Sequence, residues 1–158
     1  MNILVLCTGN SARSILLESI FNHSSGGAIQ AWSAGSKPAG QVHPHSLALL
    51  VARGHDTSDL RSKSWDEFAV PDAPVMDLVI TVCGSAASEI CPFWPGAPLR
   101  AHWGVDDPAA AAGADQQSAF QTAFDILNRR ARALLALDTD RLSPAALQQN
   151  LDMIGELP

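Results

Sequence analysis

The sequence predicts an α/β protein built as a three-layer sandwich, in which helices cover both faces of a four-stranded parallel sheet. Continuous apolar runs, typical of strands buried on both faces, alternate with stretches of helical spacing. The composition, 47% hydrophobic and 16% charged, is that of a folded chain. The length of 158 residues fits one domain. We therefore expect residues 1–158 to form a single domain, with 143–158 as its C-terminal tail.

Four predicted strands give the sheet its order. The runs at 2–6 (NILVL) and 78–82 (LVITV) are the clearest, because branched apolar residues dominate both. Weaker runs at 28–33 and 99–103 complete the sheet. With helices between the strands, a doubly wound order 2-1-3-4 is expected. Sites in such sheets lie at the carboxyl ends of the strands where the order reverses, here between the strands at 2–6 and 78–82.

The predicted helices lie between and after these strands. The first carries apolar residues at helical spacing and ends at the Ser-Ser-Gly-Gly run of residues 24–27. Pro44 and Gly54 are typical of the start and end of the second. The remaining predictions are a loop with a short helix at 60–68, a long amphipathic helix at 115–137 and a last helix within 143–154.

Charge and cysteine content exclude several classes of protein. Sixteen acidic residues against ten basic ones make a general nucleic-acid or anionic-membrane surface unexpected. No run approaches the roughly 20 apolar residues that cross a bilayer. The start MNILVLC lacks the basic leader of a signal peptide, so a cytosolic protein is expected. Three cysteines do not form a secreted disulfide framework.

The segment at 7–14, CTGNSARS, has the features of an anion-binding loop. Backbone N–H groups converge in such a strand-to-helix turn, and the helix N-terminus adds its positive dipole end. Gly9 and Asn10 permit positive φ angles, and Arg13 offers a planar fork of donors for an oxyanion. Cys7 should then have a lowered pKa and attack as a thiolate. The predicted oxyanion-binding residues are Thr8, Gly9, Asn10, Ser11, Ala12, Arg13 and Ser14.

This loop, in which five residues separate a cysteine from Arg-Ser directly after the first strand, resembles the low-molecular-weight protein tyrosine phosphatase superfamily. CTGNSARS is more similar to the arsenate reductase branch than to the phosphatase branch. The resemblance covers the chain to about residue 137. It continues through SAGSKP (33–38), VHPHSLALL (42–50), VITVC (79–83) and AHWGVDDPA (101–109).

The resemblance implies a role for each candidate residue. Cys7 is the nucleophile, Arg13 holds the oxyanion, and Asp107 before Pro108 is the general acid, with Asp106 as the alternative. The chain has no tyrosine, whereas the phosphatase branch usually carries one after its Asp-Pro. This favours a small oxyanion over a phosphotyrosine ring. A phosphatase and a non-catalytic oxyanion-binding protein stay open as alternatives.

Cys83 and Cys91 stand where arsenate reductases of this superfamily keep a redox pair. Reduction of arsenate to arsenite takes two electrons, so the resemblance implies a Cys7–Cys83 disulfide followed by a Cys83–Cys91 disulfide. Neighbouring strands lie about 4.8 Å apart, so Cys7 and Cys83 fall within reach of each other. Eight residues of unbroken helix would separate Cys83 from Cys91 by about 12 Å, so the segment at 84–90 must bend or unwind.

The expected partners are arsenate, with phosphate or sulfate as analogues, and a thiol donor. Thioredoxin is the first expectation for the donor, and glutathione with glutaredoxin is the second. No bound cofactor and no metal are expected. Some family members bind potassium beside the loop. Here Asn10, Glu18 and Ser33 match three ligand positions, but Lys63 occupies the fourth, where its ammonium would pair with Glu18 and replace the cation.

Overall fold

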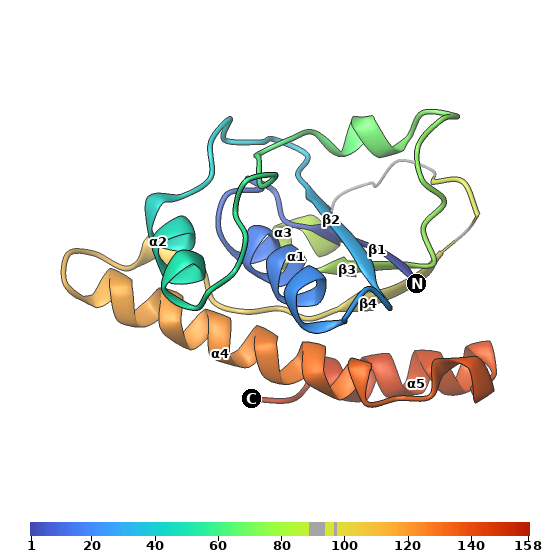
Figure 1. The fold of residues 1–158 in the computed structure, drawn as a ribbon. Coiled ribbons are helices and arrows are strands. Elements are labelled where there is room, and N and C mark those ends of the chain that lie inside the picture. Colours follow the sequence, from blue (N-terminus) through green and yellow to red (C-terminus); the bar gives the residue numbers. More distant parts are fainter. Residues whose placement is uncertain (89–93, 97) are drawn as a thin grey trace.

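The computed structural model describes residues 1–88, 94–96 and 98–158, and it contains the predicted parallel sheet (Figure 1). The strands pair in the order β2-β1-β3-β4, as predicted. They are β1 (Asn2–Leu6), β2 (Gln30–Ala34), β3 (Leu78–Thr81) and β4 (Leu99–His102). The second strand starts two residues later than expected. Gln30 pairs with Asn2, so residues 28 and 29 lie beyond the start of β1.

The predicted helices form, with ends that match their sequence signals. The α-helices of the described chain are α1 (Arg13–Ser24), α2 (Pro44–Ala52), α3 (Gly84–Ser88), α4 (Asp115–Leu135) and α5 (Pro144–Gly155). Short 3-10 helices are η1 (Trp65–Phe68), η2 (Pro108–Ala110) and η3 (Thr139–Arg141). Gly54 follows α2 with a φ of +78°, which glycine adopts without strain. The Ser143 hydroxyl accepts a hydrogen bond from the backbone of Ala146 at the start of α5.

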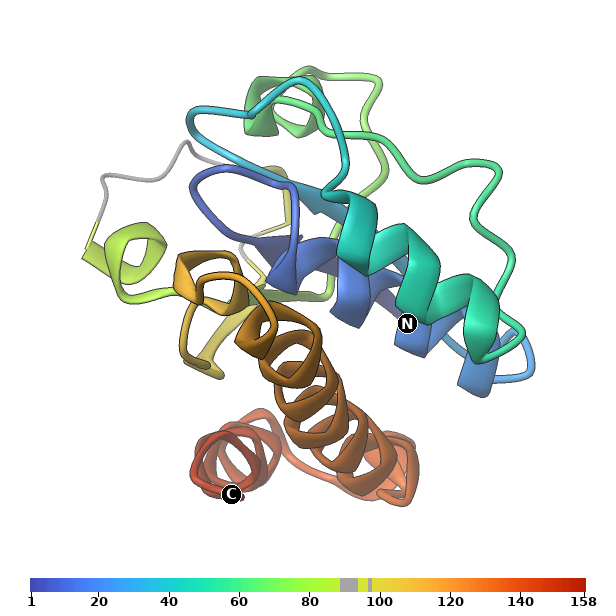
Figure 2. The same ribbon diagram turned by 90° about the vertical axis from the view of Figure 1, so that its left-hand side faces the viewer.

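The sheet is buried on both faces because its central strand alternates between two apolar clusters. Ile3 and Val5 of β1 pack with residues of α1 and α4, whereas Leu4 and Leu6 join Phe68 of η1 and other residues on the opposite face. In Figure 2, α4 and α5 lie on one side of the sheet and η1 on the other. The continuous apolar run at 2–6 therefore has the double burial that it predicts.

The C-terminal tail closes one end of the core. Trp103, directly after β4, is fully buried, and its indole N–H donates to the Leu151 carbonyl of α5 over 3.1 Å. A Cβ on Gly155 would lie 2.7 Å from the His102 carbonyl oxygen, so α5 packs closely against the end of β4. Among the residues that the structure describes, no helix is long and apolar enough to span a membrane.

The reversal of strand order brings two cysteines to one edge. Leu6 of β1 pairs with Thr81 of β3, and the backbone N–H of Val82 donates to the Leu6 carbonyl over 2.9 Å. Cys7 and Cys83 follow these pairs directly. The two cysteines therefore lie at the carboxyl ends of β1 and β3, where the sequence predicts the site.

Candidate active site

The loop between β1 and α1 is held by Asn10 at its centre. Asn10 is fully buried and has a φ of +40°. Its side-chain amide donates to the hydroxyls of Ser14 (3.0 Å) and Ser33 (2.8 Å). The side-chain Oδ1 of Asn10 accepts a hydrogen bond from the backbone N–H of Lys63 (2.8 Å). One side chain thus ties the loop to α1, β2 and the segment before η1.

Backbone contacts pull the loop carbonyls outward. Thr8, Gly9 and Ser11 accept hydrogen bonds at their carbonyls from the N–H groups of Lys37 (3.0 Å), Ala39 (2.8 Å) and His43 (3.0 Å). No side chain caps the N-terminus of α1 within the described chain. With the carbonyls directed away, the N–H end of α1 stays available to an anion.

Gly35 permits this close approach. A Cβ at Gly35 would lie 2.3 Å from the Thr8 carbonyl oxygen and 2.7 Å from that of Cys7. The residue also pairs with the segment before η1, since its N–H donates to the Lys63 carbonyl over 2.9 Å. Sequence reasoning missed this position, although a glycine directly after a strand is the signal that could have found it.

Arg13 reaches across the site to the acid loop. Its Nη1 donates to the Val105 carbonyl over 2.8 Å, and its Nη2 lies 3.3 Å from a carboxylate oxygen of Asp107. Its Nε is buried and has no hydrogen-bond partner within the described chain. An oxyanion would satisfy this donor, because a guanidinium binds such groups through two adjacent N–H groups.

Of the two candidate general acids, only Asp107 is paired with Arg13. Its carboxylate also accepts a hydrogen bond from the backbone of Ala109 over 3.1 Å, which fixes it at the start of η2. Asp106 is exposed and forms no ion pair within the described residues. This arrangement favours Asp107 for the predicted role.

A hydrogen bond between Cys7 and Cys83 is the largest influence on the pKa of each thiol. The bond to Cys83 and burial raise the pKa of Cys7, and the charge of Arg13 offsets only part of this. The hydrogen bond from Cys7 lowers the pKa of Cys83 to about 5. The backbone N–H groups of Thr8 (3.5 Å) and Ala86 (3.4 Å) add to this effect at the Cys83 sulfur.

The prediction of a lowered Cys7 pKa is therefore wrong. The reason is that Cys83 sits within hydrogen-bond reach, so the pair holds its negative charge on the sulfur with more donors. Cys7 is the proton donor of this pair. The other predicted thiol, Cys91, lies outside the described residues.

Behind the loop, Glu18 and Lys63 form the predicted ion pair. Lys63 Nζ lies 3.7 Å from Glu18 Oε2, and both side chains are more than nine-tenths buried. The same carboxylate oxygen accepts from the Ser33 hydroxyl, which in turn accepts from Asn10. Burial raises the pKa of Glu18 and lowers that of Lys63, while their mutual attraction offsets part of each shift. In the described part of the chain, no three His, Cys, Asp or Glu side chains are grouped to hold a metal ion.

Comparison with known proteins places this geometry in a family. The profile of the family described as low molecular weight phosphotyrosine protein phosphatase matches residues 2–151. The chain belongs to this family. Within it, an arsenate reductase of Halalkalibacterium halodurans is 37% identical over 130 residues, which cover 81% of this chain and 90% of that protein.

Solved structures of the family have the same fold. The thioredoxin-dependent arsenate reductase Cg_ArsC1' of Corynebacterium glutamicum matches with a TM-score of 0.63 and 27% identity, over 84% of this chain and 59% of that chain. The match thus spans less than two thirds of that protein. An arsenate reductase in a phosphate-binding state matches with a TM-score of 0.70 and 26% identity, over 85% of this chain and 96% of that one.

Proposed function

We propose that this protein reduces arsenate to arsenite through a relay of cysteine thiols. The observation that carries the proposal is the placement of Cys7 and Cys83 directly after the paired ends of β1 and β3, with the Cys83 sulfur 3.5 Å from the N–H of Thr8. Beside them, Arg13 Nε has no partner among the described residues. Hydrolysis of a phosphate ester needs one thiol, whereas a two-electron reduction needs two that can join. The similarity to arsenate reductases over most of the chain supports the same activity.

The first step forms a bond between Cys7 and arsenic. Arsenate binds at the N–H end of α1, with Arg13 Nε and the loop as donors. The Cys7 sulfur attacks arsenic, and its thiol proton passes through the Asp107 carboxylate to an arsenate hydroxyl. That hydroxyl leaves as water, so one sulfur–arsenic bond forms as one arsenic–oxygen bond breaks. Arsenic stays in the +5 state in this adduct.

The second step transfers the electrons. The Cys83 thiolate attacks the Cys7 sulfur, and the sulfur–arsenic bond breaks with its electron pair passing to arsenic. Arsenite departs with arsenic in the +3 state, and a Cys7–Cys83 disulfide remains. We propose that Cys91 then attacks Cys83, which frees the Cys7 thiol and leaves a Cys83–Cys91 disulfide for an external dithiol to reduce.

For that external donor we propose thioredoxin, because an internal disulfide is the kind of substrate that a dithiol reduces. The thioredoxin-dependent arsenate reductase among the structural neighbours supports this choice. Glutathione with glutaredoxin is the alternative donor. A reducing, cytosolic location is part of the proposal, and no bound cofactor is required for the relay.

The test follows NADPH oxidation in the presence of arsenate, thioredoxin and thioredoxin reductase. Cys7→Ser, Cys83→Ser and Cys91→Ser are each expected to abolish arsenate-dependent NADPH loss. Ser85→Ala, on α3 beside Cys83, is the matched control and should keep the rate. If p-nitrophenyl phosphate is hydrolysed efficiently, independently of Cys83, and arsenate causes no NADPH loss, the protein is a phosphatase instead. If the Cys91→Ser variant is active with glutathione and glutaredoxin but not with thioredoxin, the donor is glutathione with glutaredoxin.

A further inference from the structure

A buried arginine outside the proposed active site joins two segments that are far apart in the sequence. Arg130 lies on α4, and only 6% of it is exposed. Its Nε donates to the Leu157 carbonyl over 2.9 Å, and its Nη1 donates to the Gly104 carbonyl over 3.1 Å. Leu157 follows α5, and Gly104 lies between β4 and η2. One guanidinium therefore ties the chain after α5 to the chain after β4.

Arg130 is buried without an acidic partner in the part of the chain that the structure describes. Burial lowers its pKa, and the charge of Glu156 offsets only part of this shift. A buried cation without an ion pair costs free energy, and hydrogen bonds to carbonyls offset part of that cost. A guanidinium carries several N–H donors in one plane, so a single side chain can serve both carbonyls.

The carbonyl of Gly104 belongs to the acid loop, residues 103–107 between β4 and η2. On one side, the N–H groups of Trp103 and Val105 donate to carbonyls at the end of β3 and directly after it, over 2.8 Å and 3.2 Å. On the other side, the residue between them is held to α4 by Arg130. The acid loop is therefore fixed between β3 and α4.

The same loop carries the groups that meet Arg13. The Val105 carbonyl accepts from Arg13 Nη1 over 2.8 Å, and the Asp107 carboxylate lies 3.3 Å from Arg13 Nη2. Both follow Gly104 within a few residues. A shift of the Gly104 backbone would therefore move Asp107 relative to Arg13.

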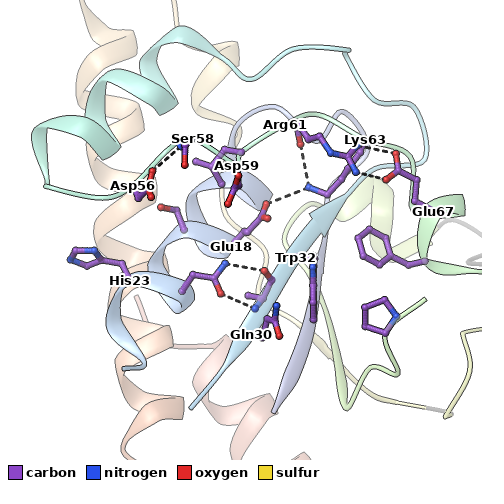
Figure 3. A pocket seen from close by; sticks show the side chains of 16 residues that line it. Glu18, His23, Gln30, Trp32, Asp56, Ser58, Asp59, Arg61, Lys63 and Glu67 are labelled. Atoms are coloured by element: carbon purple, nitrogen blue, oxygen red, sulfur yellow. Dashed lines mark hydrogen bonds and ion pairs between the residues drawn. The ribbon is translucent and has the colours of Figure 1, made fainter. Parts of the chain in front are cut away.

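The anion-binding loop at 7–14 has supports of its own. Asn10 ties it to Ser33 and Lys63. Figure 3 shows Lys63 paired with Glu18 in the hollow behind this loop, and neither Arg130 nor the acid loop lines that hollow. Removal of the Arg130 guanidinium should therefore displace the acid loop and leave the anion-binding loop in place.

We propose that Arg130 is a positioning residue of the reaction. It holds the Gly104 carbonyl against α4 and thereby keeps Asp107 beside Arg13, where Asp107 passes the Cys7 proton to arsenate. The chemical step in this inference rests on the proposed function, whereas the effect of Arg130 on the acid loop can be measured without it.

The kinetic test is the single-turnover release of arsenite from reduced protein, which needs no thiol donor. Arg130→Met should lower the maximal rate about 10- to 100-fold and change the half-saturating arsenate concentration by less than about twofold. Arg132→Met removes an exposed arginine of the same helix and should change neither value. Arg130→Lys keeps the charge and can reach one carbonyl, so its rate should lie between the two. An unchanged rate in Arg130→Met, or a loss confined to arsenate affinity, would overturn the proposal.

A double variant tests whether Arg130 acts through Asp107. Adding Arg130→Met to Asp107→Asn should lower the rate by less than about twofold beyond Asp107→Asn alone, because the group that Arg130 positions is already absent. If the two losses multiply in full, Arg130 acts on the reaction independently of Asp107 and the proposal is wrong.

Amide hydrogen exchange measures the acid loop in the absence of any activity. In Arg130→Met, exchange at 103–107 should become about tenfold faster or more, while exchange at 7–14 stays unchanged. Circular dichroism checks that each variant is folded, and Arg130→Lys takes the place of Arg130→Met if the latter is not. Unchanged exchange at 103–107 would overturn the proposal. If the wild-type protein releases no arsenite, the proposed function fails, and exchange at 103–107 alone decides whether Arg130 holds the acid loop.

Discussion

The two halves of the proposed active site are held in different ways. The loop at 7–14 is fixed by residues far away in the sequence, among them Ser33, His43 and Lys63. The segment at 83–88 is held mainly by local bonds, such as those from the Ser88 hydroxyl to the carbonyls of Gly84 and Ser85. Its distant sulfur contacts run from Cys83 to Cys7 and Thr8.

This difference matches what each half must do in the proposed relay. An anion site works best when its donors are fixed before the anion arrives, because no reorganisation is then needed. A cysteine that passes a disulfide from one partner to another must move, and local bonds can be broken and remade without disturbing the core.

Arg13→Lys should reduce arsenate turnover about 100- to 1000-fold, because lysine lacks the planar fork that binds an oxyanion through two N–H groups. Thiol-dependent NADPH oxidation measures this rate. Arg53→Lys, on the surface beside α2, is the matched control and should keep the rate. A loss in Arg13→Lys no greater than in this control would mean that the anion binds elsewhere.

Lys63→Met should lower the free energy of unfolding at pH 7 by about 3 kcal/mol, because it leaves the Glu18 carboxylate buried without its cation. Adding Glu18→Gln should restore most of this loss in urea denaturation. Burial already raises the pKa of Glu18, so the folded state holds that proton more tightly than the unfolded state. The deficit of Lys63→Met should therefore shrink as the pH falls and return as the pH rises through the folded pKa. A deficit independent of pH would contradict this account.

Gly35→Ala should cost about 1–3 kcal/mol of unfolding free energy, because its Cβ would meet the carbonyls of Thr8 and Cys7. The matched change in the other half, Gly84→Ala, adds a Cβ with no atom within 4 Å. We expect its effect to stay within about 0.5 kcal/mol. If both variants lose the same unfolding free energy, the loop at 7–14 is not packed more tightly than α3.

Cys83→Ala should lower the pKa of Cys7, because Cys7 then loses its hydrogen-bond acceptor and keeps the attraction of Arg13. The reverse change, Cys7→Ala, should raise the pKa of Cys83 above its present value of about 5. Ultraviolet absorbance of the thiolates during a pH titration measures both, in a Cys91→Ser background. If the two variants leave the remaining thiol unchanged, the hydrogen bond between the sulfurs does not set their pKa values.

Potassium should have no effect on turnover. The ammonium of Lys63 already lies beside Glu18, at the position where a cation would support the loop. Rates in potassium chloride and sodium chloride at equal ionic strength are the measurement. A rate stimulated by potassium would show that Lys63 does not replace the ion.

Sequence patterns predicted the four strands and the helices α1, α2, α4 and α5 to within a few residues, but they did not predict α3 (Gly84–Ser88). They succeeded because burial on both faces leaves uninterrupted apolar runs, and because Pro44, Gly54 and Ser143 are local signals for helix ends. The resemblance also indicated the pairing of Lys63 with Glu18. The close packing at Gly35 was missed, because it depends on a contact between two loops that are distant in the sequence.

The chain by itself determined the fold class, the strand order and the composition of the anion loop, since these follow from local pattern and from the short connections between strands. Three features appear only in the tertiary structure: the ion pair of Arg13 with Asp107, the Arg13 Nε that has no partner among the described residues, and the mutual influence of Cys7 and Cys83 on each other's pKa. The physical reason is that hydrogen-bond geometry and desolvation depend on which groups from distant segments meet, and a local pattern does not record this.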